Sequence, residues 1–346
     1  MSRFLGLCTI HEPPNNRAVG KKGRQPARFT ARSLHDTNDK ERTMKAVRFH
    51  QYGGPEVLTI EDIAKPTPGP GQVRIAVKAA GINPIDWKLR AGYMHAMMPI
   101  AMPAGSGFDA AGIVDAVGEG VSGVAVGDAV FGKGIDTMAE FAILQEWTTK
   151  PPGLSFEEAA GYPVAVETAT RILAEVGVKP GETLLVSGGA GGVGSAVIQL
   201  AKAAGIRTIG TASASKHDYL RSLGAIPTTY GPGLADRVAA LAPQGVQAAL
   251  DIAGSGVIPE LVAITGDASK VLSISDLSAP QHGAKTSFEP MEAVQATKAL
   301  TSAATLFTAG AFTLTVEQTF PLDRIAAAHE LSAKGHVTGR LVITMH

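Results

Sequence analysis

The stretch Gly189-Ala190-Gly191-Gly192-Val193-Gly194 decides the fold predicted for this chain. It has the spacing Gly-x-Gly-x-x-Gly, it follows an apolar run at Thr183–Ser187 that predicts a buried strand, and it opens a helix predicted over Gly192–Ala204. The first glycine permits a tight turn, the second lets the backbone approach a pyrophosphate, and the third lets the helix pack on the strand. We therefore expect all six residues to bind a dinucleotide.

Strands and helices alternate after this motif. Further strands are predicted at Arg207–Ala212, Val246–Ile252 and Lys270–Ser275, and further helices at His217–Leu223 and Ala235–Leu241. Apolar runs of this length between helices are typical of a parallel sheet that is covered on both faces. The cofactor of such a sheet lies at the carboxyl ends of the strands, which predicts that it also contacts Ala253, Gly254, Ile274 and Ser275.

The residues after the second strand of this sheet indicate which dinucleotide binds. NAD sites usually place an acid there, which hydrogen-bonds the ribose hydroxyls and would repel a 2′-phosphate. The segment Thr211–His217 has no acid, whereas Ser213 can donate a hydrogen bond and Lys216 supplies positive charge. The pattern favours NADPH as the cofactor, although a solvated lysine at a helix start remains the alternative for Lys216.

The chain before residue 150 predicts a β-rich domain. Short strands separated by glycine turns are predicted at Lys45–His50, Val57–Ile63, Gln72–Ala80, Ala110–Val117, Asp128–Phe131 and Ala139–Leu144. Helices follow from Ser155, and a last unit with strands at Ala311–Gln318 and Arg340–Thr344 around a helix at Asp323–Ala333 indicates that the chain returns to the first domain. The fold class is thus α/β, with a doubly wound parallel sheet over 167–309 inserted into a β-rich domain made of 44–166 and 310–346.

The composition excludes several classes of protein. The 346 residues carry 31 Lys and Arg against 31 Asp and Glu, so no global field attracts nucleic acid or an anionic membrane, and a nucleic-acid partner is not expected. A single cysteine excludes a disulfide framework and cysteine-rich metal sites. The longest uncharged runs contain prolines, glycines or threonines and predict buried segments rather than membrane spans. We expect a cytoplasmic homodimer that takes a small-molecule substrate.

Residues 1–43 differ from the rest of the chain. They carry nine basic and four acidic residues, hold the only cysteine, Cys8, and show no helical or strand periodicity. No apolar run follows a basic start, so they do not resemble a secretory signal. A disordered extension and an organellar targeting signal both remain open, and Asp36, Asp39 and Glu41 favour the extension.

Several further motifs follow one another along residues 44–346. They are Met44-Lys-Ala-Val, Tyr52-Gly-Gly-Pro-Glu, Ala80-Gly-Ile-Asn-Pro-Ile-Asp86, Gly107-Phe-Asp-Ala-Ala-Gly-Ile-Val114, Val126-Gly-Asp-Ala-Val-Phe-Gly132, Ala190-Gly-Gly-Val-Gly-Ser195 and Gly335-His-Val-Thr-Gly-Arg340. With these motifs the chain resembles the zinc-free medium-chain dehydrogenase/reductases of the quinone oxidoreductase type. The resemblance implies a Rossmann domain inserted in a GroES-like catalytic domain, with the active site in the cleft between them.

The resemblance also implies hydride chemistry without a metal. In the zinc alcohol dehydrogenases of this superfamily, a cysteine ligand occupies the position of Asn83, and a His-Glu pair occupies the position of Phe108-Asp109. Neither Asn83 nor Phe108 can replace a zinc ligand, so no metal site is predicted and polarisation of a carbonyl by zinc is not expected. The expected activity is the NADPH-dependent reduction of a quinone or an α,β-unsaturated carbonyl compound. A non-catalytic NADPH-binding scaffold or sensor is the alternative.

Residues outside the glycine motif also receive roles from the resemblance. Asn83 is expected to reach the nicotinamide ribose or a substrate oxygen, which makes it both a cofactor-binding and a catalytic candidate, and Thr168 is expected near the nicotinamide. Tyr230 is expected to flank the adenosine phosphate beside the serine and lysine named above, and Arg340 is expected to bind the cofactor. The alternatives are a loop-capping amide for Asn83 and a partly buried aromatic residue for Tyr230.

The sequence leaves two candidates for the proton donor of the expected mechanism. Related enoyl reductases carry a tyrosine shortly after the Asn-Pro-x-Asp segment, but here Tyr93 falls one position early and Met94 takes the expected place. Either Tyr93 turns into the site or water supplies the proton. Asp86 and Trp87 are expected to be structural, as a helix-start acid and a packing indole. The methionines within 94–102 are expected at the substrate mouth.

Overall fold

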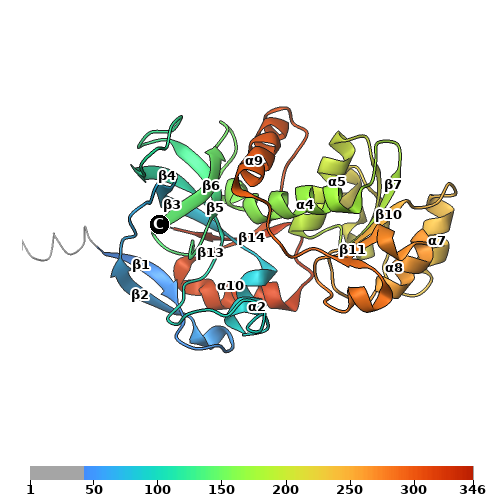
Figure 1. The fold of residues 1–346 in the computed structure, drawn as a ribbon, viewed down its shortest axis with the longest axis horizontal. Helices are drawn as coiled ribbons and strands as arrows, with labels where there is room; N and C mark the ends of the chain where they lie inside the picture. The colour runs from blue at the N-terminus through green and yellow to red at the C-terminus, as the bar shows by residue number, and fades with distance from the viewer. Residues whose placement is uncertain (1–42, 346) are drawn as a thin grey trace, which may run out of the picture. The chain divides into compact units, whose positions relative to one another are not determined.

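Two six-stranded β-sheets organise residues 43–345, which are the part of the chain that this computed structural model describes (Figure 1). A two-stranded antiparallel sheet of β1 (Thr43–Arg48) and β2 (Thr59–Ala64) precedes them in the sequence. The prediction made for residues 1–43 lies outside the described residues, apart from Thr43. Among residues 43–345, every helix is too short or too polar to cross a bilayer.

One of the two larger sheets is parallel and has the strand order β12-β11-β10-β7-β8-β9. Its strands are β7 (Thr183–Ser187), β8 (Arg207–Thr211), β9 (Ile226–Thr228), β10 (Ala248–Asp251), β11 (Val271–Ser273) and β12 (Lys285–Thr286). The chain winds outward from β7 through β8 and β9, then returns to the other side of β7 at β10, which creates a switch point at the carboxyl ends of β7 and β10. This is the order of a doubly wound nucleotide-binding sheet, so the predicted fold class is confirmed.

Four helices connect the strands of the parallel sheet. They are α5 (Gly192–Ala203), α6 (His217–Leu223), α7 (Leu234–Leu241) and α8 (Ile258–Thr265). The α5 helix buries Ala196, Val197 and Ala201 in the core that it shares with β7, because these side chains recur on one face at helical spacing. That packing places the first turn of α5 at the carboxyl end of β7, where a dinucleotide is expected.

The other large sheet is β-rich and mostly antiparallel, with the order β13-β14-β3-β4-β5-β6. Its strands are β3 (Val73–Ile82), β4 (Asp109–Val117), β5 (Ala129–Gly134), β6 (Phe141–Thr149), β13 (Val316–Pro321) and β14 (Arg340–Thr344). Because β3 also pairs with β6, the strands β3 to β6 close into a barrel around Val73, Ile75 and Leu144, which are fully buried. The last strand, β14, pairs with β3, so the chain does return to the sheet that it began.

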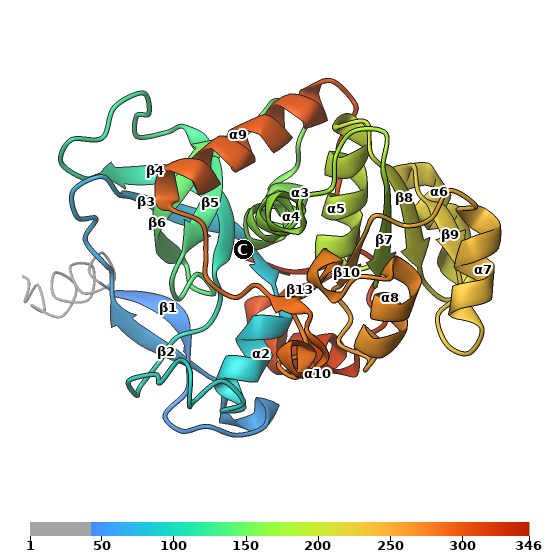
Figure 2. The same ribbon diagram turned by 45° about the vertical axis from the view of Figure 1, so that its right-hand side comes forward.

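A helix between the two sheets gives them a common core. The helices outside the parallel sheet are α2 (Pro84–Arg90), α3 (Phe156–Ala160), α4 (Pro163–Val176), α9 (Ala293–Thr308) and α10 (Ile325–Lys334). Figure 2 shows α4 nearly end-on between the barrel strands and the parallel sheet, and α4 contacts both β5 and β10. The buried Tyr162 precedes α4 and packs edge-on against Phe131 and Phe312, at ring distances of 5.7 and 5.1 Å. The predicted domain limit at residue 166 falls inside α4, and the domain limits stay a prediction.

The α9 helix occupies a region where no element was predicted. The segment is rich in threonine, whose β-branched side chain lowers helix propensity. In the structure, the hydroxyls of Thr301, Thr305 and Thr308 each donate to the carbonyl four residues earlier. The helix packs on β6 and α4, so tertiary contacts override the weak local signal.

The strand predicted from Ala311 begins only at Val316. Buried Phe312 and Leu314 flank Thr313, which imitates the alternation of a strand. However, the Gln199 side chain is hydrogen-bonded to both backbone groups of Thr313. Its Oε1 accepts from the Thr313 N–H at 2.9 Å, and its Nε2 donates to the Thr313 carbonyl at 2.7 Å. These backbone groups are therefore not available to a sheet.

Candidate active site

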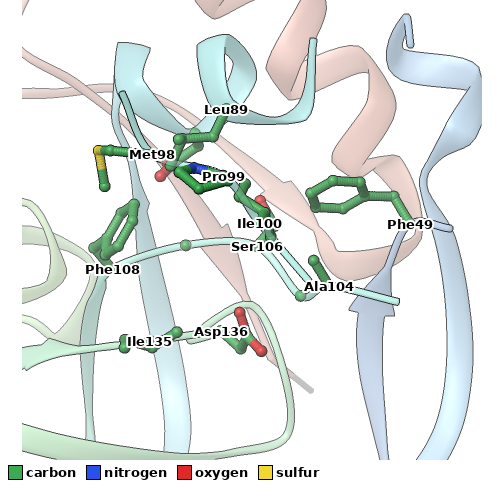
Figure 3. Close-up of a pocket in the computed structure, with 13 residues that line it drawn as sticks. Phe49, Leu89, Met98, Pro99, Ile100, Ala104, Ser106, Phe108, Ile135 and Asp136 are labelled. Carbon is green, nitrogen blue, oxygen red and sulfur yellow. The ribbon is translucent and has the colours of Figure 1, made fainter. Parts of the chain in front are cut away.

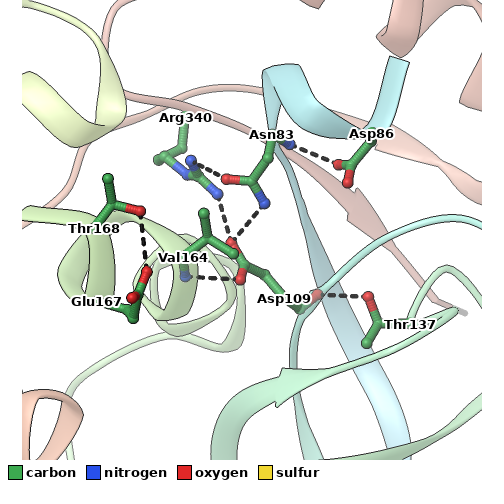
Figure 4. Close-up of polar contacts among 8 residues, drawn as sticks. All are labelled: Asn83, Asp86, Asp109, Thr137, Val164, Glu167, Thr168 and Arg340. Carbon is green, nitrogen blue, oxygen red and sulfur yellow. Dashed lines mark hydrogen bonds and ion pairs between the residues drawn. The ribbon is translucent and has the colours of Figure 1, made fainter. Parts of the chain in front are cut away.

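Three side chains from distant parts of the chain form a buried polar network (Figure 4). Asn83 lies between β3 and α2, Asp109 begins β4, and Arg340 begins β14. The Asn83 Nδ2 donates to Asp109 Oδ2 at 2.9 Å, and Arg340 donates to Asn83 Oδ1 at 2.8 Å and to Asp109 Oδ2 at 2.7 Å. Each of the three residues is at most 3% exposed. The network thus lies where three neighbouring strands of the β-rich sheet, β14, β3 and β4, begin or end.

The network neutralises a buried carboxyl group. Burial raises the pKa of Asp109, and the Arg340 guanidinium, the Asn83 amide and the Val164 N–H act in the opposite direction. The Asn83 amide is bonded through both its oxygen and its nitrogen, yet one lone pair and one N–H remain for a ligand. Its expected contact with the cofactor or the substrate stays a prediction.

The glycine loop between β7 and α5 leaves room for a ligand against its backbone. A Cβ on Gly191 would have no contact closer than 3.8 Å, whereas a Cβ on Gly194 would lie 2.2 Å from the carbonyl oxygen of Gly188. The motif predicts the tight turn at its first glycine, but the left-handed conformation lies one residue earlier, at Gly188 (φ 87°), because β7 ends at Ser187 and the turn follows at once. The first N–H groups of α5 have no partner within the helix, so the loop fits a pyrophosphate.

Arg340 connects this loop to the polar network. A Cβ on Gly192 would lie 2.5 Å from Arg340 Cδ, so the arginine side chain runs directly past the first turn of α5. The N–H of Gly339 donates to the carbonyl of Ala190 at 2.8 Å. The Nε of Arg340 is buried and has no hydrogen-bond partner among residues 43–345. The predicted cofactor-binding residues of the glycine motif and Arg340 are therefore brought together.

The residues expected around the adenosine phosphate lie after β8 and β9. The Lys216 side chain donates to the carbonyl of His336, a residue in the loop before β14. Ser213 Oγ is 3.1 Å from Ser215 Oγ, and Tyr230 is 55% exposed. The structure thus adds His336, which the sequence analysis did not identify, because only the fold brings this loop to Lys216.

Thr168 lies on α4 and is held by a charged neighbour. Its hydroxyl donates to Glu167 Oε2 at 3.2 Å, and Glu167 Oε1 accepts from Arg171 at 3.0 Å and from the Met291 N–H at 2.8 Å. These bonds tie α4 to the segment before α9. The sequence analysis did not identify Glu167, because its partners are fixed only by the tertiary structure.

The predicted residues after β10 and β11 lie in two adjacent loops. Ser275 donates through Oγ to the Ile252 carbonyl at 2.7 Å, and the Gly254 N–H donates to Asp251 Oδ1 at 3.0 Å. Burial raises the pKa of Asp251, which accepts from the Ser273 hydroxyl at 2.8 Å. Ala253 and Ile274 belong to the same two loops, at the carboxyl edge of the parallel sheet.

A cavity of about 160 Å³ lies beside the polar network (Figure 3). It is lined by Phe49, Asp86, Leu89, Met98, Pro99, Ile100, Ala104, Gly105, Ser106, Gly107, Phe108, Ile135 and Asp136. Phe108, at the position of a zinc-binding histidine in the zinc enzymes, is part of this lining. Most of the lining is apolar, which suits an apolar ring or chain.

Tyr93 is not part of this cavity lining. Its side chain is 72% exposed and packs edge-on against Trp87 at a ring distance of 5.8 Å. Of the methionines expected at the substrate mouth, Met98 lines the cavity. Trp87 packs as expected, but its partner is the candidate proton donor itself.

Within residues 43–345, no three His, Cys, Asp or Glu side chains come together in an arrangement that could hold a metal ion. The positions of two zinc ligands in the zinc enzymes are taken by an amide that is bonded to Arg340 and by the ring of Phe108. The residues present therefore do not fit a catalytic zinc ion.

Comparison with known proteins gives the family. Residues 69–170 match the alcohol dehydrogenase GroES-like domain, and residues 231–343 match the zinc-binding dehydrogenase domain. The quinone oxidoreductase of Sus scrofa is 41% identical over 180 residues, which cover 50% of this chain and 54% of that protein. The NADPH-dependent alkenal/one oxidoreductase, chloroplastic, of Arabidopsis thaliana is 40% identical over 197 residues, which cover 53% of this chain and 51% of that protein. The match thus spans about half the length of these curated relatives.

A solved structure extends the likeness over the whole described fold. The quinone oxidoreductase from Coxiella burnetii has a TM-score of 0.75 and 30% sequence identity, and the match covers 88% of this chain and 100% of that one. The resemblance seen in the sequence motifs is therefore confirmed, including the GroES-like domain. The chain belongs to the medium-chain dehydrogenase/reductases, in the quinone oxidoreductase group.

Proposed function

We propose that this protein is an NADPH-dependent reductase that acts on quinones or α,β-unsaturated carbonyl compounds without a metal ion. The observation that carries the proposal is the position of the Arg340–Asn83–Asp109 network between two binding features. On one side, Arg340 runs past the glycine loop. On the other side, the Asn83 N–H donates to Asp86, which lines the apolar cavity. A cofactor on the loop and a substrate in the cavity would therefore meet at Asn83.

The residues around the loop fit NADPH. The open face at Gly191 and the first N–H groups of α5 would hold the pyrophosphate, and Ser213 and Lys216 would bind the 2′-phosphate, where no acid repels it. Lys216 already binds a carbonyl oxygen, so its ammonium group is directed at an acceptor. NADPH, when bound, supplies a hydride to the substrate.

The residues around the cavity bind and orient the substrate. Phe49, Leu89 and Phe108 give the cavity an apolar lining, which would strengthen a hydrogen bond made to a substrate carbonyl there. Because Phe108 replaces a metal ligand, the developing negative charge has to be stabilised by hydrogen-bond donors of the protein. The names of the two curated relatives support both acceptor classes, a quinone and an alkenal or enone.

The proposal is tested by NADPH oxidation with para-benzoquinone and with cyclohexenone, each product being identified by chromatography. Turnover of either compound at a rate well above that of the protein-free mixture supports the proposal. Tight NADPH binding without turnover of either compound contradicts it and favours the scaffold or sensor. The cytoplasmic location and the homodimer stay predictions.

A further inference from the structure

Asp86 has one carboxyl oxygen that the protein leaves without a partner. The residue lies in the first turn of α2 and is 3% exposed. Its Oδ2 accepts the Asn83 N–H at 2.7 Å, whereas its Oδ1 is buried and has no hydrogen-bond partner among residues 43–345 (Figure 4). Asp86 also lines the cavity. The sequence predicts a structural helix-start acid, and the structure adds an unpaired oxygen on a residue of the cavity lining.

The surroundings of Asp86 favour its protonated form. The pKa of Asp86 is raised to about 8, mainly by burial. The backbone N–H of Asn83 and the positive charge of Arg340 lower this pKa, whereas the negative charge of Asp109 raises it further. Arg340 is committed to Asn83 and Asp109 and donates no hydrogen bond to Asp86. An ionised Asp86 would bury a charge with only one hydrogen bond to stabilise it, so the proton is retained at neutral pH.

The other charged groups near α2 act elsewhere. Arg90, at the far end of α2, interacts with Glu330 and His329 on α10 and with Glu56 on the turn Pro55–Val57. The second carboxyl of the cavity lining, Asp136, pairs with Arg48 at 3.6 Å. Asp86 is therefore the acid in the lining that has no cation bound to it within the described part of the chain.

A neutral Asp86 carries an O–H donor that needs an acceptor. Leaving such a donor unpaired inside the protein costs stability, and functional sites are where such costs recur. The carbonyl oxygen of a substrate in the cavity would provide that acceptor, and the α-carbon becomes able to take the proton once hydride addition has formed the enolate. Tyr93, the donor suggested by the resemblance, is instead exposed and stacked on Trp87.

We propose that Asp86 is the proton donor in the reduction of an α,β-unsaturated carbonyl compound built on a single six-membered ring. This inference rests on the function proposed above. Hydride addition to the β-carbon moves the electron pair of the C=C bond into an enolate. The O–H bond of Asp86 then breaks, its proton forms the new C–H bond at the α-carbon, and the carboxylate regains a proton from water. The enone is reduced to a saturated ketone, and NADPH is oxidised.

The ring size follows from the cavity. A cavity of about 150 Å³ lined by Leu, Ile and Phe side chains is known to hold one benzene ring. The cavity beside Asp86 has a volume of about 160 Å³, with Phe49, Leu89 and Ile100 in its lining. Cyclohexenone is therefore the probe that matches both the volume and the chemistry.

The test compares Asp86→Asn with Asp62→Asn, the same change at an exposed position on β2. Asparagine at 86 keeps an oxygen for the Asn83 N–H and an N–H for the substrate, but it has no proton to transfer. We expect kcat with cyclohexenone to fall by about 10²–10⁴, and kcat with para-benzoquinone, whose oxygens water can protonate, to change less than about tenfold. Asp62→Asn is expected to match wild type. Loss of less than about tenfold with cyclohexenone overturns the proposal.

The pH profile gives a second reading, first for wild type and then in comparison with Asp86→Asn. Because the protonated acid is the active form, kcat/KM of wild type for cyclohexenone should fall as the pH rises above about 8, the pKa of Asp86. The profile with para-benzoquinone should lack this alkaline fall. An enone profile that stays level through pH 10, or an alkaline fall that persists in Asp86→Asn, overturns the proposal.

Infrared difference spectroscopy separates this inference from the proposed function. Wild type at neutral pH should show the carbonyl stretch of a protonated carboxylic acid, which disappears at high pH and is absent in Asp86→Asn but present in Asp62→Asn. If wild type reduces neither compound, the proposed function fails. If the band does not respond to pH or to Asp86→Asn while wild type still reduces cyclohexenone, only the role of Asp86 fails.

Discussion

Arg340 donates a hydrogen bond of 2.7 Å to Asp109 across a separation of 231 residues, and both side chains are almost completely buried. Gly81 makes this contact possible, because a Cβ there would lie 3.1 Å from both Arg340 Nη2 and Asp109 Cβ. The pair fastens β14, at the end of the chain, to β4 in the barrel. It also positions Asn83, so one ion pair contributes to both the fold and the site.

Removing the acid of this pair should strongly destabilise the protein. In Asp109→Ala, the Arg340 guanidinium stays buried without a counter-ion, and we expect the free energy of unfolding to fall by about 3–5 kcal/mol. Urea denaturation measures the change. The control is Asp62→Ala, which removes an exposed partner of Lys45 and should cost less than about 1 kcal/mol. Similar losses in the two variants would contradict the importance of burial.

Lys216 should determine the preference for NADPH over NADH. We expect NADPH to bind at least about tenfold more tightly, which is roughly 1.4 kcal/mol, because the proposed pairing of the lysine with the 2′-phosphate would be opposed by no acid. Lys216→Ala should abolish the preference in fluorescence titrations. The control is Lys270→Ala, which removes the same charge directly before β11, at the amino ends of the parallel strands. This variant should leave the preference unchanged. An unaltered preference in Lys216→Ala would refute this role.

Activity should survive exhaustive chelation. Asn83 and Phe108 occupy positions of zinc ligands in the zinc enzymes and cannot replace them, so no step of the proposed reaction needs a metal. We expect the rate with para-benzoquinone to be unchanged after treatment with a strong chelator, and elemental analysis to find no stoichiometric metal. Inactivation that added zinc reverses would show that the prediction is wrong.

Tyr93 should contribute little to catalysis. It is exposed and packs on Trp87, outside the cavity lining. Tyr93→Phe keeps the aromatic contact and removes only the hydroxyl, so we expect less than about a tenfold loss of kcat with cyclohexenone or para-benzoquinone at saturating NADPH. A collapse with cyclohexenone alone would show that the loop moves and that Tyr93, not Asp86, supplies the proton.

The elements that the sequence predicted best are those with a strong local signal. The buried strand β7, the helix α6 and the last strand β14 have the predicted limits, because each combines a clear apolar pattern with a distinct start or stop. The α9 helix was not predicted, and the strand predicted from Ala311 was wrong around Thr313. No local pattern indicates the hydrogen bonds in these two segments. Threonine hydroxyls supply them in α9, and the Gln199 side chain supplies them at Thr313.

The candidate site residues could be named from the sequence, but their arrangement could not. Asn83 and Arg340 lie in motifs that the sequence shows, yet their hydrogen bond depends on β14 pairing with β3. The unpaired oxygen of Asp86 is a tertiary property, because it results from what the neighbouring side chains do not offer. The contact of Lys216 with His336 likewise requires two loops that are far apart in the sequence.

Gly191 and Gly194 lie in the same loop, but substituting them should affect different properties, cofactor binding at Gly191 and stability at Gly194. A Cβ on Gly191 would make only an ordinary contact of 3.8 Å with the Gly188 carbonyl oxygen, and the backbone there has an ordinary extended conformation (φ −78°, ψ 174°). Gly191→Ala should therefore change the free energy of unfolding by less than about 1 kcal/mol. The new methyl group would occupy the space that the pyrophosphate needs. We therefore expect the Kd for NADPH to rise at least about tenfold.

Gly194→Ala should have the opposite profile. Its Cβ would lie 2.2 Å from the Gly188 carbonyl oxygen, a backbone atom that cannot move aside without shifting α5 from β7. We expect a loss of about 1–3 kcal/mol in the free energy of unfolding, the usual cost of overpacking. Thermal unfolding and NADPH titration of both variants give the comparison. If Gly191→Ala binds NADPH like wild type, the cofactor does not lie against this loop. If Gly194→Ala is as stable as wild type, the close packing of α5 on the loop is not what requires a glycine at position 194.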